Sequence, residues 1–218
     1  YEQIVLRLNR KGEPSTDLVI VRGLRAYASN RDRPMPTQPS QFAMILRKYL
    51  NNSRLVGVEQ FGFDRVIRVE FEHGRGRLSL VIELFRDGNV LLLDEDGVII
   101  RPLTHAKYAS RSLKKGERYS PPPEAVDPRN MDRDALDEIL TGSDHALIRT
   151  LASRANLGRV YGSAVCSISG IDEDAQSDSL TIEQRDSLEA ALKEMLRDLD
   201  RGEGGNIWLS DEESKTSW

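Results

Sequence analysis

The sequence predicts an α+β fold in which a β-rich sandwich or partly closed barrel is followed by a small helical domain. Three observations lead to this prediction. Residues 54–101 consist of short apolar runs separated by glycine-containing turns at regular spacing. Three consecutive prolines at 121–123 end that pattern, and helical periodicity replaces it. The length of 218 residues suffices for one medium domain or two small ones with a buried core.

The chain is expected to open with a β-hairpin. Residues 3–8 and 17–22 have the composition of strands, and Lys11-Gly12-Glu13-Pro14 supplies the turn between them. Residues 30–39 contain three prolines, which deny the backbone its donors, so this segment is predicted to be an irregular connector.

A helix is predicted next, from the N-cap candidate Ser40 to about Leu50. Its apolar side chains recur at helical spacing on one face: Phe42, Ile45, Leu46, Tyr49 and Leu50. Arg47 and Lys48 point away from that face and are therefore expected to be exposed.

Residues 54–101 are predicted to form an antiparallel meander. Apolar and polar side chains alternate along residues 66–71, so one face of that strand is buried and the other polar. Turns are expected at Gly74-Arg75-Gly76, Asp87-Gly88-Asn89 and Asp96-Gly97.

Beyond the prolines, amphipathic helices are predicted at residues 132–140, 144–155, 160–168 and 181 to about 200. Thr181 and Gln184 have the spacing of a capping box at the start of the last helix. Along that helix a leucine stripe suits packing within the domain and is too short for several coiled-coil heptads. The expected organisation is a β-rich domain over 1–125, a helical domain over 126–200 and a disordered acidic tail over 201–218.

Charge is distributed unevenly along the chain. The formal net charge is −4, but residues 172–218 alone carry 14 acidic and 5 basic side chains. Residues 1–171 are therefore net basic, which favours a polyanionic partner for the body of the protein.

Several function classes receive no support from the sequence. No apolar run approaches the length of a membrane helix, so no membrane contact is expected. The one cysteine, Cys166, and three scattered histidines favour a reducing, cytoplasmic setting without a structural metal site. No phosphate loop, dinucleotide fingerprint or catalytic triad is apparent, so no cofactor and no small-molecule substrate are expected. The first residue is not methionine, which suggests that further residues precede it.

Three basic features are candidates for nucleic-acid contacts. The first is the pair Arg47 and Lys48. The second is the segment 101–118, whose cations suit phosphates, while the rings of Tyr108 and of Tyr119, which follows the segment, suit stacking. Its candidate contacts are Arg101, Lys107, Arg111, Lys114 and Lys115. The alternative for the first feature is an ordinary solvated helix face, and the alternative for the second is a charged connector.

The third feature is the dipeptide Asp64-Arg65, which follows Gly62 directly before a predicted strand. A guanidinium there could hold a phosphate or a base edge while the carboxylate orients it. The alternative is a local surface ion pair that contributes little.

Taken together, the motifs resemble the N-terminal module of the NFACT family, the ribosome quality-control factors long called fibronectin-binding proteins. The resemblance covers about residues 1–200. It is carried, in order, by residues 42–50; residues 58–66; Glu83-Leu84-Phe85 with Gly88-Asn89-Val90 and Asp94; Ser110-Arg111 with Gly116, Tyr119 and Pro121-Pro122; and Leu157-Gly158 with Tyr161 and Gly170-Ile171-Asp172.

The resemblance implies a fold and a function. The β domain would be similar to the N-terminal domain of formamidopyrimidine-DNA glycosylases, and the helical domain would be helix-hairpin-helix-like. Family members bind large ribosomal subunits that carry an obstructed peptidyl-tRNA, recruit charged tRNA and promote non-templated tailing of the stalled chain. Asp64 and Arg65 match the pair implicated in tRNA engagement. Because the ribosome makes the peptide bond, the protein would act by positioning and would not be an enzyme.

The sequence also departs from the family pattern. The family segment of the form G-G-x-Y-A-E-E is here Gly158-Arg159-Val160-Tyr161-Gly162-Ser163-Ala164, without the acidic pair. The family's opening helix, coiled coil and C-terminal RNA-binding domain lie outside this sequence, so the fragment is not expected to perform the whole activity.

Two other functions remain as alternatives. A DNA-glycosylase-like DNA-binding domain follows from the related fold, although the chain begins Tyr1-Glu2-Gln3 where those enzymes have a proline nucleophile. An extracellular-matrix-binding adhesin follows from the older family name.

Overall fold

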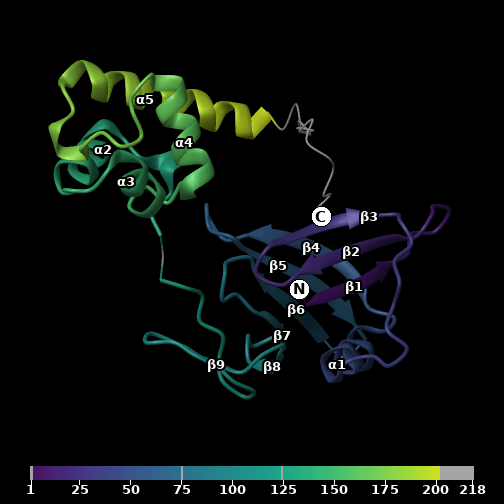
Figure 1. The fold of residues 1–218 in the computed structure, drawn as a ribbon. Helices are drawn as coiled ribbons and strands as arrows, with labels where there is room; N and C mark the ends of the chain where they lie inside the picture. The colour runs from purple at the N-terminus through teal and green to yellow at the C-terminus, as the bar shows by residue number, and fades with distance from the viewer. Residues whose placement is uncertain (1, 75, 124, 202–218) are drawn as a thin grey trace. The chain divides into compact units, whose positions relative to one another are not determined.

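The computed structural model describes residues 2–74, 76–123 and 125–201. The chain divides into two compact units, residues 1–125 and residues 126–218 (Figure 1). The first unit contains antiparallel sheets and one long helix, and the second is helical. The predicted α+β class is confirmed in this form.

The first unit opens with a three-stranded antiparallel sheet. Its strands follow one another in sequence and in space: β1 (Gln3–Leu8), β2 (Thr16–Val21) and β3 (Arg25–Ser29). The expected hairpin is present, with Val5 opposite Val19. Sequence patterning did not reveal β3, because its residues are mostly exposed and its only large apolar side chain is Tyr27.

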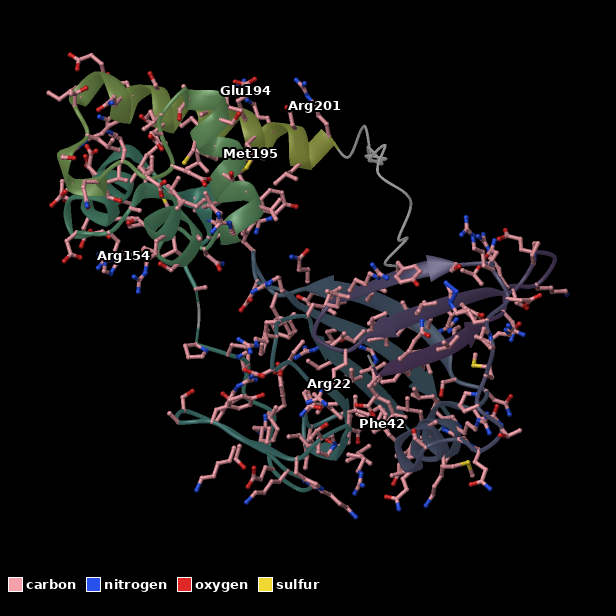
Figure 2. The ribbon with its side chains drawn as sticks, viewed as in Figure 1. Arg22, Phe42, Arg154, Glu194, Met195 and Arg201 are labelled. Atoms are coloured by element: carbon pink, nitrogen blue, oxygen red, sulfur yellow. The ribbon has the colours of Figure 1, made fainter. Side chains whose placement is uncertain are left out.

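The connector at 30–39 is irregular as expected, and α1 (Gln41–Leu50) follows it. Ser40 is the N-cap, and its hydroxyl accepts a hydrogen bond from the backbone N–H of Ala43. Phe42 (Figure 2) lies on the apolar face of the helix, and it is buried together with Leu46. The helix is thereby anchored on the sheets.

A five-stranded antiparallel meander forms the second sheet. Its strands lie in sequence order: β4 (Arg54–Gln60), β5 (Val66–His73), β6 (Gly76–Glu83), β7 (Val90–Leu93) and β8 (Ile99–Pro102). The register shifts between Leu55 and Gly57, which marks a bulge in β4. The predicted meander is confirmed by the strand order. The turn expected at Gly74-Arg75-Gly76 includes Arg75, which lies outside the described residues.

One core lies between the two sheets and α1. It joins residues of the first sheet, of α1 and of the second sheet: Ile4, Ile20, Phe42, Leu46, Val69, Phe71, Leu80, Ile82, Val90 and Leu92. These residues alternate along their strands with residues of the opposite face, so each sheet contributes one side to this core.

A second core lies on the other face of the meander. It includes Val66, Val81, Leu91, Leu93, Ile99 and Leu113. The segment after β8 covers this face through two short strands, β9 (Ala106–Lys107) and β10 (Ser112–Leu113). Sequence analysis did not predict these strands, because each is only two residues long.

The second unit is built from α2 (Arg133–Thr141), α3 (Leu147–Ser153), α4 (Gly158–Ser169) and α5 (Ile182–Arg201), with 3₁₀ turns η1 (Pro128–Asn130) and η2 (Ser177–Ser179). The capping box of α5 is confirmed, since Thr181 N–H donates to Gln184 Oε1 and Gln184 N–H donates to Thr181 Oγ1. Leu188 and Leu192 are buried on the predicted stripe. Arg201 still belongs to α5, and the rest of the predicted tail lies outside the described residues.

None of the helices in the described part of the chain combines the length and the apolar character needed to cross a membrane. Within the same residues, no group of three histidine, cysteine or acidic side chains is arranged to hold a metal ion.

Candidate nucleic-acid interface

Asp64 and Arg65 lie in the tight turn between β4 and β5. Phe61 N–H donates to the carbonyl of Val66 at 3.0 Å, and Asp64 N–H donates to the carbonyl of Phe61 at 2.9 Å. Gly62 has φ = 52°, in the left-handed region that glycine adopts without strain. The turn therefore presents both side chains at the mouth of β5, as the sequence predicted.

The two side chains are held differently. Asp64 Oδ1 accepts the backbone N–H of Arg65 at 2.7 Å, and Gln60 Nε2 donates to the carbonyl of Asp64 at 2.9 Å. Arg65 is exposed, and in the described residues no ion pair joins its guanidinium to Asp64. The carboxylate thus shapes the turn, and the guanidinium is exposed.

A buried polar network supports the turn from behind. Leu84 N–H donates to the carbonyl of Arg65 at 2.7 Å, and Glu83 is paired with Val66 in the register of β5 and β6. Glu83 is fully buried and forms an ion pair with Arg111. The backbone of the turn is therefore tied to the most buried charge of the first unit.

Tyr119 completes this network, since its hydroxyl donates to Glu83 Oε1 at 3.0 Å. Burial, followed by the charge of Glu83, raises the pKa of Tyr119 well above its usual value. Arg111 also donates to the carbonyl of Ser120 at 3.1 Å, and its side chain is only 5% exposed. Arg111 thus has a structural position, and we leave it out of the contact surface for nucleic acid.

The loop between β6 and β7 is equally constrained. A Cβ on Gly88 would lie 2.1 Å from the carbonyl oxygen of Glu83, so only glycine fits there. Asn89 Oδ1 accepts the N–H groups of Val90 and Thr104. Arg22 Nε donates to the carbonyl of Gly88 at 3.0 Å. Gly88 and Asn89, which carried part of the family resemblance, therefore hold the backbone of this loop in place and do not form an exposed contact surface.

Arg68 is a second cation close to the turn, and sequence analysis did not select it. Its guanidinium lies over the ring of Phe61, 4.8 Å from the centroid. Its Nε is buried without a hydrogen-bond partner. In the sequence, only the register of the hairpin could have indicated this contact. It places Phe61 opposite Val66, and Arg68 lies on the same face of β5 as Val66, two residues further on.

The remaining predicted contacts fall into two groups. Arg47 and Lys48 are exposed in the last turn of α1, and Arg101 reaches the first residue of that helix, with its Nη2 3.5 Å from Gln41 Oε1. The other group is made of exposed lysines around β9 and β10: Lys107, Lys114 and Lys115.

Tyr108 lies within the segment 101–118, and Tyr119 follows it directly. Both pack against the second core. Tyr108 donates its hydroxyl to the carbonyl of Asp87 at 2.6 Å. Because both rings are engaged in this way, the expected role of these tyrosines in stacking on bases is not supported by their positions.

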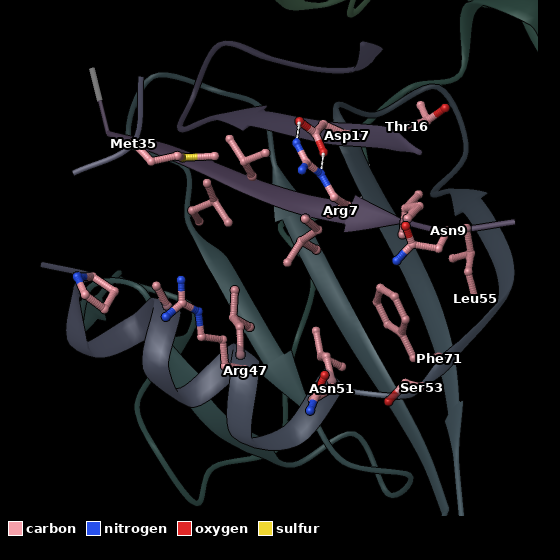
Figure 3. Close-up of a pocket in the computed structure, with 18 of the residues that line it drawn as sticks. Arg7, Asn9, Thr16, Asp17, Met35, Arg47, Asn51, Ser53, Leu55 and Phe71 are labelled. Carbon is pink, nitrogen blue, oxygen red and sulfur yellow. Dashed lines mark hydrogen bonds and ion pairs between the residues drawn. The ribbon is translucent and has the colours of Figure 1, made fainter. Parts of the chain in front are cut away.

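An open groove of about 1310 Å³ separates β1 from α1 (Figure 3). Its floor includes Leu46 and Phe71, and its β-sheet side carries the hydrogen-bonded pair of Arg7 and Asp17. Arg47 points into the groove from α1 (Figure 3).

The combination of antiparallel sheets, α1 and a following helical unit also occurs in other proteins, as comparison with known families and structures shows. The chain matches the family described as NFACT N-terminal and middle domains over residues 1–218. It belongs to the NFACT family, and the resemblance found in its sequence is confirmed.

Among curated proteins, the chain is 31% identical over 219 residues to the archaeal Rqc2 homolog aRqcH of Methanocaldococcus jannaschii, covering 97% of this chain and 32% of that protein. It is 39% identical over 95 residues to ribosome quality control complex subunit 2 of Saccharomyces cerevisiae, covering 44% of this chain and 9% of that protein. The chain thus spans about a third of the archaeal relative.

A solved structure shares the fold. The N-terminal part of the fibronectin/fibrinogen-binding protein from Streptococcus suis superimposes with a TM-score of 0.62 at 23% identity, covering 88% of this chain and 73% of that one. At this identity the likeness concerns the fold alone.

Proposed function

We propose that this chain is the tRNA- and large-ribosomal-subunit-binding module of a ribosome quality-control factor. In this role it recruits charged tRNA to obstructed large subunits that carry peptidyl-tRNA, for non-templated C-terminal tailing of the stalled chain. The match to relatives carries the proposal: the archaeal Rqc2 homolog aligns with 97% of this chain, and a second relative, which aligns with 44% of it, is named ribosome quality control complex subunit 2. The peptide bond is left to the ribosome, so the module acts by positioning tRNA.

The turn at Asp64 and Arg65 supports this function at the atomic level. Its backbone is fixed by the hydrogen bond from Leu84, so an approaching nucleic acid meets a pre-formed loop. A guanidinium offers a planar fork of N–H donors that matches a phosphate or a base edge. Arg68, whose guanidinium lies over the ring of Phe61, adds a second oriented cation on the strand that follows the turn.

The exposed cations on α1 and around β9 and β10 fit a different task. Exposed cations suit contacts to the phosphate backbone of tRNA or ribosomal RNA, and such contacts do not distinguish one base sequence from another. The cations in question are Arg47, Lys48, Lys107, Lys114 and Lys115. Arg101 lies at the start of α1 and would extend that surface.

The test replaces both residues of the turn, as Asp64→Ala/Arg65→Ala. Because both side chains lie outside the cores, we expect the free energy of unfolding to change by no more than about 1 kcal/mol. Association with tRNA should fall, while co-sedimentation with large subunits should persist because other surfaces contribute. Melting temperature, tRNA filter binding and sucrose-gradient sedimentation measure the three quantities.

The matched control is Asp198→Ala/Arg201→Ala, an exposed pair of the same two residue types on α5. Both variants leave the net charge unchanged, so a difference between them reports position and not charge. Unchanged tRNA association in a folded Asp64→Ala/Arg65→Ala variant would refute the role of the turn. Unfolding of that variant would instead make the two residues a structural pair.

A further inference from the structure

Tyr27 and two arginines form a cluster on the outer face of the first sheet. Tyr27 lies on the edge strand β3, opposite Val19 of β2, whereas its neighbour Ala26 packs against the core between the sheets. The ring of Tyr27 is therefore on the side away from that core. The residue is 36% exposed.

Both arginines direct their guanidinium groups over this ring. Arg25 Cζ lies 5.7 Å and Arg33 Cζ 5.5 Å from the ring centroid, within the range of cation–π attraction. Arg33 Nη2 also donates to the Tyr27 hydroxyl at 3.3 Å. The connector at 30–39 is thus brought onto β3, and two cations share one aromatic platform.

No carboxylate in the described part of the chain forms an ion pair with Arg25 or Arg33, and Arg33 Nε is buried without a hydrogen-bond partner. The buried carboxylate on the same sheet face, Asp17, is already bound by Arg7 at 2.9 and 3.2 Å. The charge of Arg33 acts on Asp17 through space and, after that of Arg7, helps to lower the pKa of its carboxyl. Arg25 is exposed, whereas Arg33 is half-buried, with its Nη2 on the Tyr27 hydroxyl and its Nε buried. The N–H groups of Arg25 and the remaining Nη group of Arg33 are the donors that a partner outside the chain would use.

We propose that Arg25, Tyr27 and Arg33 form a binding site for a single-stranded segment of RNA. The arginine edges hold backbone phosphates, and an unpaired base stacks on the exposed part of the ring or on a guanidinium plane. An acidic peptide would use the charges but not the stack, so the aromatic platform favours RNA. This site deepens the proposed function and rests on it, and it belongs to a different sheet from the Asp64–Arg65 turn.

The test measures binding of a fluorescent, unstructured oligouridine to the chain by anisotropy across a salt series. Arg25→Gln/Arg33→Gln should weaken binding about tenfold and lower the log–log salt slope by about 1.4, since each phosphate contact on a single strand contributes about 0.7. Tyr27→Leu should weaken binding by a similar factor with little change in slope, because it removes stacking and no charge. Tyr27→Phe should bind almost as wild type.

The matched control is Lys11→Gln/Arg77→Gln, which removes two exposed cations that, in the described residues, form no ion pair and lie over no aromatic ring. It should leave the slope nearly unchanged. Equal losses for both double variants would overturn the proposal, and so would competition by polyglutamate as effective as competition by RNA. Two outcomes separate this proposal from the proposed function. If neither Arg25→Gln/Arg33→Gln nor Asp64→Ala/Arg65→Ala weakens binding of RNA, the proposed function fails. If only Asp64→Ala/Arg65→Ala weakens it, the Tyr27 site alone is rejected.

Discussion

Glu83 is the residue on which the candidate interface depends most, although it touches no solvent. Its carboxylate is fully buried against Arg111 and Tyr119, and the next residue bonds the backbone of Arg65. A buried ion pair contributes little net stability compared with well-packed apolar residues. Removing one partner, however, leaves the other charge buried without a counter-charge, which destabilises the fold. The network therefore fixes geometry more than it adds free energy.

Glu83→Leu should consequently destabilise the protein by about 3–5 kcal/mol, because Arg111 would be left buried without a counter-charge. The double variant Glu83→Leu/Arg111→Met should recover a large part of that loss. Urea denaturation at neutral pH measures both.

Glu72→Leu is the control, since it breaks the exposed pair with Arg54 in the same sheet and should cost no more than about 1 kcal/mol. If Glu83→Leu and Glu72→Leu cost the same, the buried pair has no special role. A double variant no more stable than Glu83→Leu would show that the shape of the network matters and not its charge.

At the level of single residues, the sequence identified charges but not their surroundings. Arg65 and Arg111 have the same chemistry and both matched family motifs, yet one is exposed and the other lies in the interior. Burial depends on β6 and the segment after β8 meeting in space, which no local pattern records. For the same reason Arg68 and the pair Arg25 and Arg33 were passed over.

Among the elements, those with strong local signals were predicted well. The helix after Ser40 and the meander of 54–101 were found because capping, alternation and glycine turns all agreed. Strand β3 was missed because its partner strand, and not its own composition, makes it a strand. The segment 101–118 had the composition of a connector, but Leu113 anchors it to the second core.

The capping box of α5 gives a prediction at this scale. Thr181→Ala removes the hydroxyl that accepts the N–H of Gln184, so we expect a loss of about 1 kcal/mol in the free energy of unfolding of the helical unit. Thermal and urea unfolding followed by circular dichroism measure it.

Ser167→Ala serves as the control, because Ser167 is exposed within α4 and Ala is the better helix former. That variant should be neutral or slightly stabilising. A Thr181→Ala variant as stable as Ser167→Ala would mean that packing of Leu188 and Leu192 alone holds the start of α5.

Across the whole molecule, the two compact units carry opposite charge. Residues 1–125 contain 21 basic and 15 acidic side chains, whereas residues 126–218 contain 10 basic and 20 acidic ones. The difference in net charge between the two compact units is therefore larger than the difference between residues 1–171 and 172–218 considered in the sequence. A net charge of +6 on one unit and −10 on the other favours a polyanion at the first unit and discourages one at the second.

Binding of tRNA to the chain should therefore weaken steeply with salt. If about six cations of the first unit contact phosphates, the log–log slope is about −4 to −5, and affinity falls roughly a thousandfold between about 50 and about 200 mM salt. Fluorescence anisotropy with labelled tRNA measures the slope. A flat dependence over this range would contradict a phosphate-based interface.

The contribution of the lysines around β9 and β10 can be separated from the effect of net charge. Lys107→Gln/Lys114→Gln/Lys115→Gln should reduce the steepness of the slope by about 2, because each lost phosphate contact removes roughly 0.7 to 0.9. The control Arg149→Gln/Arg159→Gln/Arg197→Gln removes the same charge from exposed positions of the acidic unit. Since the like-charged carboxylates of that unit repel phosphates, its cations should contribute little and the slope should hold. Equal reductions in both variants would mean that tRNA senses only the overall charge of the chain, and the lysines would then have no defined place in the interface.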